Sequence, residues 1–152
     1  MPKDPDISFS RIVYEVFDPI IKEYDLANHQ KSDQLIVFSK DNIQLLCRLE
    51  AIPLFYYFSL EIRLLGELAH QVASEADSKY HHLGVSTIAG CLDPAYKSPL
   101  RGAQTEDELR ELVTTARDEL QKYCRDILLY DVSSWHKVIR RLEENKEDSS
   151  SV

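Results

Sequence analysis

Hydrophobic side chains recur every three or four residues between Phe9 and Tyr24, which is the spacing of an amphipathic helix. Pro19 lies within this segment and cannot donate a helical hydrogen bond, so the helix either kinks there or restarts with Asp18 as its N-cap. The apolar face continues across the proline in both cases. Residues 27–33, which follow, are polar and lack any period, and this pattern predicts a loop.

The pattern changes to that of β-strands over residues 34–65, a run rich in Ile, Val, Leu, Phe and Tyr. Polar residues at 40–42 and a proline-containing segment at 51–53 divide this run into three strands. The short connections favour an antiparallel meander whose second strand is central. If Asp41 and Asn42 form the first turn, Phe38 lies opposite Leu45 and Ile36 opposite Cys47.

The second turn decides which side chains share a face, because directly opposed residues of an antiparallel pair point to the same side of the sheet. A loop over residues 51–54 places Glu50 opposite Phe55 and Arg48 opposite Tyr57. One face of the sheet is then entirely apolar and is expected to form the core. It comprises Ile43, Leu45, Cys47, Leu49, Tyr56, Phe58, Leu60 and Ile62.

The opposite face mixes apolar and polar side chains, and its apolar end is large enough to need a covering partner. Tyrosine and arginine are also the residues that commonly anchor protein interfaces. The candidate partner-binding residues are Leu35, Val37, Leu46, Arg48, Phe55 and Tyr57. Two interpretations stay open: another protein covers this patch, or a helix of the same chain does so, with the terminal helix and its Trp135 as the candidate.

The second half of the chain is predicted to be mainly helical. Residues 66–80 and 83–92 contain short apolar patterns and are expected to form two short helices. Residues 93–102 contain two prolines and a glycine, which predict a loop.

Thr105 and Glu108 have the spacing of a capping box, which starts a helix of about six turns. After a break near residues 130–134, a terminal helix follows. The chain is thus predicted to be a single α+β domain, residues 1–142, in which a three-stranded antiparallel meander is flanked by an N-terminal helix and C-terminal helices. Residues 143–152 are acidic and rich in serine, and this composition predicts a disordered tail.

Charge and hydropathy exclude two classes of partner. The chain has 26 acidic and 18 basic residues, a net charge of −8, and no basic run, so nucleic acid is not expected as a partner. No apolar stretch approaches the roughly 20 residues that span a bilayer. Acidic residues interrupt the first 15 positions, which is unlike a signal peptide, so a cytoplasmic location is expected. The three cysteines, Cys47, Cys91 and Cys124, are predicted to be reduced core thiols.

Candidate chemistry is sparse along the chain. Histidines and acids gather between residues 67 and 82, as Glu67, His70, Glu75, Asp77, His81 and His82. Metal sites in helical bundles need the Glu-x-x-His spacing twice, and it occurs once here, so a solvated helix face is predicted and no metal or cofactor. Cys91 and Ser86 follow glycines but have no neighbouring base, so no catalytic residue is assigned and the chain is not expected to be an enzyme.

The order helix, meander, helices resembles that of small bacterial α+β proteins, some of which are similar to immunity proteins of toxin systems. The segments that carry this resemblance are residues 23–26, 35–38, 45–49 and 127–131. The chain departs from the pattern at Asp25 and Tyr130, where such proteins often have glycine. The resemblance lies in hydrophobic spacing rather than in a catalytic motif, and it transfers no functional residue.

We therefore expect a non-catalytic protein-interaction module that binds through the sheet face. An acidic immunity or accessory protein that blocks a basic partner, such as a toxin, is the concrete form of this hypothesis, and a homodimer is its variant. The alternative is a small-ligand sensor or an enzyme whose pocket lies between the sheet and residues 66–102. A pocket lined by Tyr80, His81 and His82 would favour the alternative.

Overall fold

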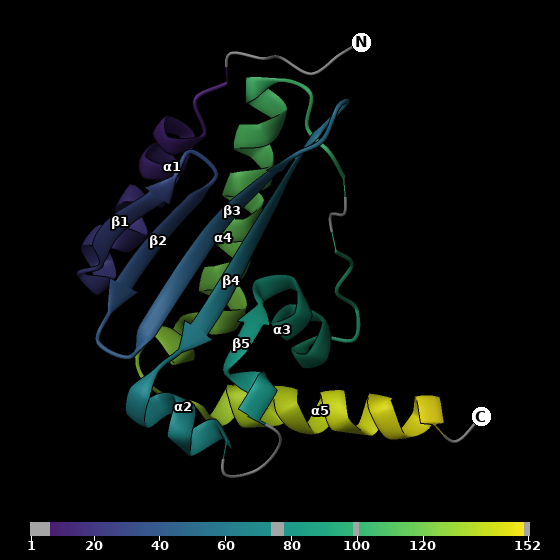
Figure 1. Cartoon of the computed structure of the whole chain (residues 1–152). Coiled ribbons are helices and arrows are strands. Elements are labelled where there is room, and N and C mark those ends of the chain that lie inside the picture. Colours follow the sequence, from purple (N-terminus) through teal and green to yellow (C-terminus); the bar gives the residue numbers. More distant parts are fainter. Residues whose placement is uncertain (1–6, 74–77, 99–100, 151–152) are drawn as a thin grey trace.

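The computed structural model describes residues 7–73, 78–98 and 101–150 of the chain. It is an α+β structure in which a five-stranded antiparallel sheet, in the order β1-β2-β3-β4-β5, packs against helices (Figure 1). The elements in chain order are α1 (Phe9–Tyr24), β1 (Ala27–Ser32), β2 (Leu35–Lys40), β3 (Ile43–Ala51), β4 (Tyr56–Leu64), α2 (Gly66–Ala73), a 3₁₀ turn (Ser78–His81), β5 (His82–Gly84), α3 (Val85–Leu92), α4 (Glu106–Leu128) and α5 (Ser133–Ser150).

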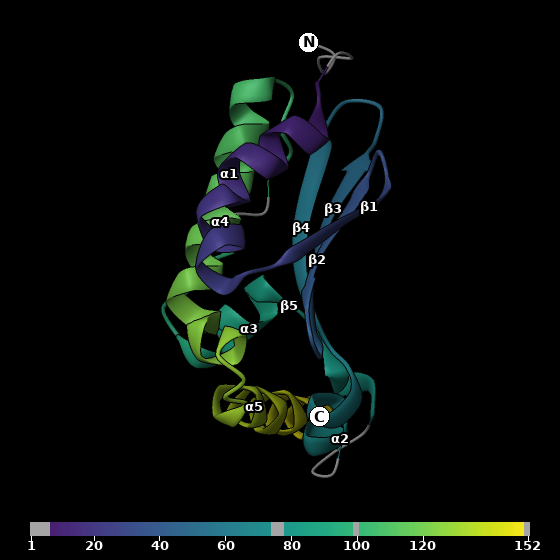
Figure 2. The same ribbon diagram turned by 90° about the vertical axis from the view of Figure 1, so that its left-hand side faces the viewer.

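Helices α1 and α4 lie side by side on one face of the sheet, and the core fills the space between them and the strands (Figure 2). The apolar side chains predicted to face inward along β2, β3 and β4 do so, and they are buried or packed against this core. Arg117 Nη1 on α4 donates to the carbonyl of Val16 on α1 at 3.2 Å, which ties the two helices together. Among the described helices, none combines the length and apolarity that crossing a bilayer requires.

The sheet has two strands more than the meander predicted from the sequence. Residues 27–32 form β1, an edge strand whose six side chains are all exposed, so its sequence shows no alternation even though its backbone pairs with β2. Residues 82–84 form β5, which pairs with β4 before the chain turns into α3. Residues 83 and 84, expected at the start of a short helix, therefore belong to a strand.

The first turn has the predicted register, with Phe38 opposite Leu45. The second does not. Ile52 and Phe55 exchange both backbone hydrogen bonds, at 3.0 and 3.3 Å, so the turn contains only Pro53 and Leu54. The predicted loop, residues 51–54, begins two residues too early and ends at the correct residue, so the pairing is shifted by two residues.

Two corrections follow from this shorter turn. Tyr57 lies opposite Glu50, and Arg48 lies opposite Ser59 rather than opposite Tyr57. Because the shift is an even number of residues, every side chain keeps its predicted face.

The helix boundaries follow local chemistry. Helix α1 continues through Pro19 from its N-cap Ser8, so no second cap at Asp18 is needed. Helix α4 begins at the predicted capping box: the Glu108 amide donates to Thr105 Oγ1 at 3.2 Å. The Glu108 carboxylate returns to the amide of Gln104, at 3.5 Å, rather than to that of Thr105.

Left-handed backbone conformations occur where α1 and α4 end. Asp25 has φ 53° and Tyr130 has φ 66°, a region in which glycine is the least strained residue. The Tyr130 hydroxyl donates to Asp41 Oδ2 at 2.8 Å, and Asp41 itself has φ 50° in the β2–β3 turn. This contact joins the end of α4 to the end of the sheet. Helix α5 then extends to Ser150 and so includes most of the segment predicted to be a disordered tail.

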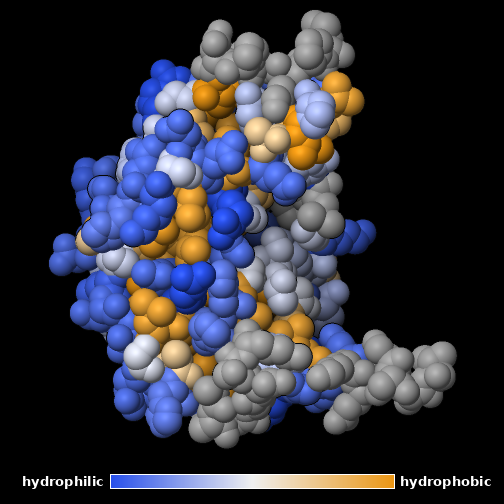
Figure 3. All heavy atoms as spheres, in the orientation of Figure 1, coloured by the Kyte–Doolittle hydropathy of each residue, from blue (hydrophilic) through white to orange (hydrophobic). Residues whose placement is uncertain are grey.

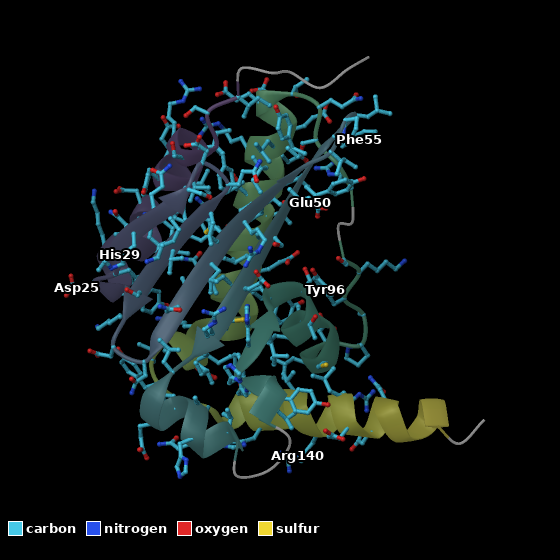
Figure 4. All side chains as sticks on the ribbon, viewed as in Figure 1. Asp25, His29, Glu50, Phe55, Tyr96 and Arg140 are labelled. Carbon is cyan, nitrogen blue, oxygen red and sulfur yellow. The ribbon has the colours of Figure 1, made fainter. Side chains whose placement is uncertain are left out.

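Trp135 anchors α5 to the lower end of the core. Its side chain is fully buried, and Nε1 donates to the carbonyl of Tyr80 at 2.7 Å. Phe55 lies at the opposite end of the sheet from α5 (Figure 4). The interpretation in which the terminal helix covers the outer sheet face through Trp135 is therefore wrong, because the indole is used to dock α5 against the segment that leads into β5.

We predict that Trp135→Ala lowers the free energy of unfolding by about 3 to 5 kcal/mol, the range for removing a large buried aromatic side chain. Leu129→Ala is the matched control, since Leu129 is 59% exposed beside the same helix junction, and its effect should stay within about 0.5 kcal/mol. Urea denaturation followed by circular dichroism measures both. Equal effects of the two substitutions would contradict the docking of α5 through Trp135.

Candidate functional site

The second face of the sheet has no helix over it in the described part of the chain (Figure 2). Seen from this side, apolar atoms form a strip along the middle strands, bordered by hydrophilic side chains (Figure 3). Val37 on β2 and Leu46 on β3 lie opposite each other, and neither belongs to the main core cluster. Both are nonetheless buried, with 4% and 3% of their surfaces exposed. We call this surface the open face.

The six predicted partner-binding residues share the open face but differ in accessibility. Val37 and Leu46 are buried, Leu35 and Phe55 are half-buried, and Arg48 and Tyr57 are exposed, Tyr57 to 38%. The Phe55 and Tyr57 rings are in contact, with centroids 6.3 Å apart. What covers part of Phe55 is the loop before α4, through Gly102, rather than a helix. A partner would thus meet a ring of polar and aromatic groups before it reached the aliphatic centre.

A row of charged side chains crosses the open face from β3 to β5. Arg48 Nε donates to Glu61 Oε2 at 3.2 Å, and His82 Nε2 lies 3.2 Å from Glu61 Oε1 without hydrogen-bond geometry. Of the six histidines and acids that gather between residues 67 and 82, only His82 belongs to this row of charged groups. Glu75 and Asp77 lie outside the described residues. Within the part of the chain that the structure describes, no group of three or more His, Cys, Asp or Glu side chains could hold a metal ion.

A pocket of about 440 Å³ adjoins the open face along the outer edge of β4. The strand forms one wall, the start of α3 the floor and α4 the back, and Ser98 and Arg101, which lie between α3 and α4 in the chain, line the far wall. Figure 4 shows Phe55 at the turn, Glu50 below it and Tyr96 lower still along this side of the molecule. The lining residues are Arg48, Glu50, residues 57–61 of β4, Gly84, Val85, Ser86, Ser98, Arg101, Leu112, Ala116 and Glu119.

The backbone of β4 presents unused hydrogen-bonding groups to this pocket. The turn bonds of Phe55, and the bond from the Leu65 amide to the Asn42 carbonyl at 2.7 Å, show that odd-numbered residues of β4 bond to β3. Even-numbered residues therefore direct their N–H and C=O groups to the outer edge. Tyr56 uses both of its groups in a bridge to Ala103, each bond 2.8 Å long.

Pairing with β5 resumes only at Glu61. Among the residues that the structure describes, the N–H and C=O of Phe58 and the N–H of Leu60 have no backbone hydrogen-bond partner, either in the bridge to Ala103 or in the pairing with β5. The edge of β4 is consequently open opposite residues 57–60, in the middle of the pocket wall.

The far wall of the pocket is held to α4 by a specific set of contacts. Tyr123 Oη donates to Asp93 Oδ2 at 2.7 Å, and the Ala95 amide donates to Asp93 Oδ1 at 3.0 Å. These two hydrogen bonds hold the pKa of Asp93 below its usual value. The rings of Tyr96 and Tyr123 meet edge to face with centroids 5.8 Å apart. The loop is thus fixed on α4 at the lower end of the pocket.

Glu119 is the acidic group at the back of the pocket. It is half-buried on α4, near the hydroxyl of Tyr96, which donates to Ser86 Oγ at 3.4 Å. Burial raises the pKa of the Glu119 carboxyl above its usual value, and the nearby Tyr96 hydroxyl opposes that rise. Both arginines at the pocket already have acidic partners: Arg101 pairs with Glu111 at 2.9 Å, and Arg48 pairs with Glu61. Glu119 and the exposed Glu50 have no cation among the ion pairs of the described residues, and of the two only Glu119 is half-buried.

The pocket lies where the alternative hypothesis, a ligand-binding site or an active site between the sheet and residues 66–102, expects one. Among the described residues, its lining lacks those that this hypothesis named. Its described lining contains hydroxyl groups at Ser59, Ser86 and Ser98 but neither His nor Cys, so it holds no nucleophile–base pair of the familiar kind. Tyr80, His81 and His82 do not line it. Sequence reasoning missed Glu119, because one glutamate among many on an acidic helix looks like a solvated residue; only its position on the α4 face that carries Leu112 and Ala116 was a signal.

We predict that Glu119→Gln stabilises the unliganded protein at neutral pH. The raised pKa means that ionisation of Glu119 favours the unfolded state, so the penalty is absent below the usual glutamate pKa and grows as the pH rises through the raised value. The variant should therefore unfold at a higher temperature than wild type at pH 7, and the two should converge near pH 4. Glu111→Gln, an exposed residue of the same helix, is the control and should not show this convergence. A lower melting temperature for Glu119→Gln at pH 7 would contradict the assignment.

Gly102 allows the loop to reach the strand edge. A β-carbon at Gly102 would lie 2.6 Å from Phe55 Cβ, so Gly102→Ala should force the loop away from Tyr56 and cost about 1 to 3 kcal/mol of unfolding free energy. At Gly90 in α3 a β-carbon would meet only Tyr96 Cδ1, at 3.9 Å, and Gly90→Ala should gain about 0.5 to 1 kcal/mol from helix propensity. Thermal denaturation of both variants checks the opposite signs.

With this geometry established, the chain was compared with protein-family models, with curated proteins and with solved structures. None of the three comparisons found a match. The function of the open face and of its pocket must therefore be inferred from their own residues.

Proposed function

We propose that this protein is a non-catalytic interaction module that binds a basic partner protein through its open face. One observation carries the proposal: a sheet with an aliphatic centre at Val37 and Leu46 has no described helix over it on that side. Arg48 and Tyr57, which border this centre, are exposed and are of the types that most often anchor interfaces. A cytoplasmic immunity or accessory protein remains the form of this function that we favour.

Charge supports a partner other than a second copy of the chain. The net charge of −8 makes two copies repel each other at long range, whereas it accelerates the approach of a positively charged protein. The open face itself carries both signs, with Arg48 and Arg63 beside Glu50 and Glu61. We infer that the overall charge brings the partner close and that the face then selects it by shape and by paired hydrogen bonds.

A second candidate function is ligand binding at the β4 pocket. The observation that favours it is the pocket's volume of about 440 Å³, which lies in the range of small-molecule sites. The pocket shares Arg48 and Tyr57 with the open face, so the two sites are neighbours on one surface. The absence of His and Cys from its described lining favours binding over catalysis.

We predict that Tyr57→Asp weakens partner binding at least about tenfold while leaving the fold intact, because the substitution removes an exposed aromatic anchor and adds a charge at the border of the aliphatic centre. Leu129→Asp is the control, since Leu129 is 59% exposed and lies at the other end of the molecule. Affinity capture from native cells, followed by titration of the purified partner, gives the measurement. The partner must carry net positive charge and must protect amides of β2–β4 from hydrogen exchange.

Two results would contradict the proposal. If Tyr57→Asp and Leu129→Asp weaken binding equally, the open face is not the contact surface. If sedimentation equilibrium shows a wild-type dimer that Tyr57→Asp dissociates, the face joins two copies of this chain, and the choice of a basic partner is wrong.

A further inference from the structure

We propose that the pocket beside β4 binds a short extended peptide segment, which pairs with the strand edge at Phe58 and Leu60 and places a basic side chain on Glu119. This site borders the open face, with which it shares Arg48 and Tyr57, but a peptide can bind in it without a partner covering the sheet. It rests on three features of the described residues: the free edge groups of β4, the boundaries of the gap, and the carboxylate at the back of the pocket.

The free edge groups favour a ligand with a peptide backbone. Phe58 offers both a donor and an acceptor in the plane of the sheet, and Leu60 offers a donor, so three hydrogen bonds are available along one line. A strand that adds to a sheet edge uses this pattern, with its affinity coming from main-chain hydrogen bonds. A compact ligand without repeating donors and acceptors would leave part of this line unsatisfied, which is costly in a half-enclosed site.

The boundaries of the gap set the length and direction of the segment. Tyr56 is already bridged to Ala103 above the gap, and Glu61 is paired with Gly84 below it. Four strand positions therefore remain, roughly 13 Å at the rise of an antiparallel strand. Both flanking pairings are antiparallel to β4, so a segment that completes the same line runs in the same sense, from the β5 end toward Ala103.

The faces of the sheet then decide which ligand side chain goes where. Directly opposed residues share a face, and the Phe58 and Leu60 side chains lie on the core side, where α4 packs. Ligand residues opposite Leu60 and Phe58 must therefore point toward α4, while the residue between them points to solvent on the open face.

Glu119 lies two turns after Leu112 on α4, which runs downward alongside β4 (Figure 1). The ligand residue opposite Leu60 accordingly meets the carboxylate of Glu119, and the one opposite Phe58 meets the apolar surface of Leu112. In the antiparallel sense this corresponds to a basic residue followed, two positions later, by an apolar residue.

The test uses the full chain labelled with ¹⁵N and the capped tripeptide acetyl-Lys-Ala-Leu-amide. Titration should shift the amide signals of Phe58 and Leu60 saturably and slow their hydrogen exchange. The Ser59 amide is an internal reference, because its pairing with Arg48 on β3 should protect it with or without peptide. Acetyl-Leu-Ala-Lys-amide, with the reversed order, and acetyl-Gln-Ala-Leu-amide, without the charge, should each bind at least about tenfold more weakly.

Glu119→Gln should abolish the preference for the lysine peptide over the glutamine peptide without loss of folding, and Asp126→Asn, at an exposed acid of the same helix outside the pocket, should leave the preference unchanged. Three outcomes would overturn the inference: no saturable shift with the lysine peptide, shifts confined to open-face amides such as those of Ser39 and Gln44, or equal binding of n-butylammonium with no change at Phe58 and Leu60. The last result would make the pocket an amine site rather than a peptide site. The assay contains no partner protein, so a negative result would contradict peptide binding in the pocket without affecting the open-face proposal. In the same way, evidence against the open-face proposal would not contradict peptide binding in the pocket.

Discussion

The two-residue period of β4 is the constraint on which the rest of the structure depends. In an antiparallel strand, side chains alternate between the two faces while backbone groups alternate between the two edges. Phe58 and Leu60 therefore have side chains in the core and backbone groups at the outer edge. Phe58 packs against Phe9 of α1, with ring centroids 6.0 Å apart, so its edge groups cannot turn toward other partners without disturbing the core. The wall of the pocket is held in place by the packing of the fold.

An uncovered strand edge is usually a hazard, because it can pair with the edge of another molecule. Here the free part of the edge is short and recessed. The Tyr56–Ala103 bridge closes it above, β5 closes it below, and α3, α4 and the loop anchored by Asp93 surround it. A long strand of another molecule cannot align with so short a gap. The same enclosure that prevents sheet-to-sheet association leaves room for a short segment.

The net charge of the chain and the charges at the two proposed contact sites have different roles. The chain is acidic overall, yet the strands of the open face carry arginines and glutamates in alternation, with Glu61 between Arg48 and His82. Glu119 lies instead at the back of the pocket, half-buried and without a cation among the ion pairs of the described residues. Its ionisation is disfavoured by burial, which is a cost that a bound cation would relieve. The two proposed contacts thus depend on different interactions. The open face would bind through shape and aromatic side chains, and the pocket would bind through backbone hydrogen bonds and an ion pair.

The sequence by itself determined which residues face the core and where the long helices begin. The alternation from Ile36 to Ile62 assigned both faces of the sheet correctly, since an error of two residues in the turn at Pro53 and Leu54 leaves parity unchanged. The capping box at Thr105 marked the start of α4, because the signal lies within four adjacent residues. Only tertiary structure decided the rest. The exposed side chains of β1 carry no pattern, β5 is too short to show one, and both exist because a neighbouring strand supplies their hydrogen bonds. The pocket joins residues 48 to 119, and Glu119 differs from the other acids of α4 through what packs beside it, which no local pattern of residues records.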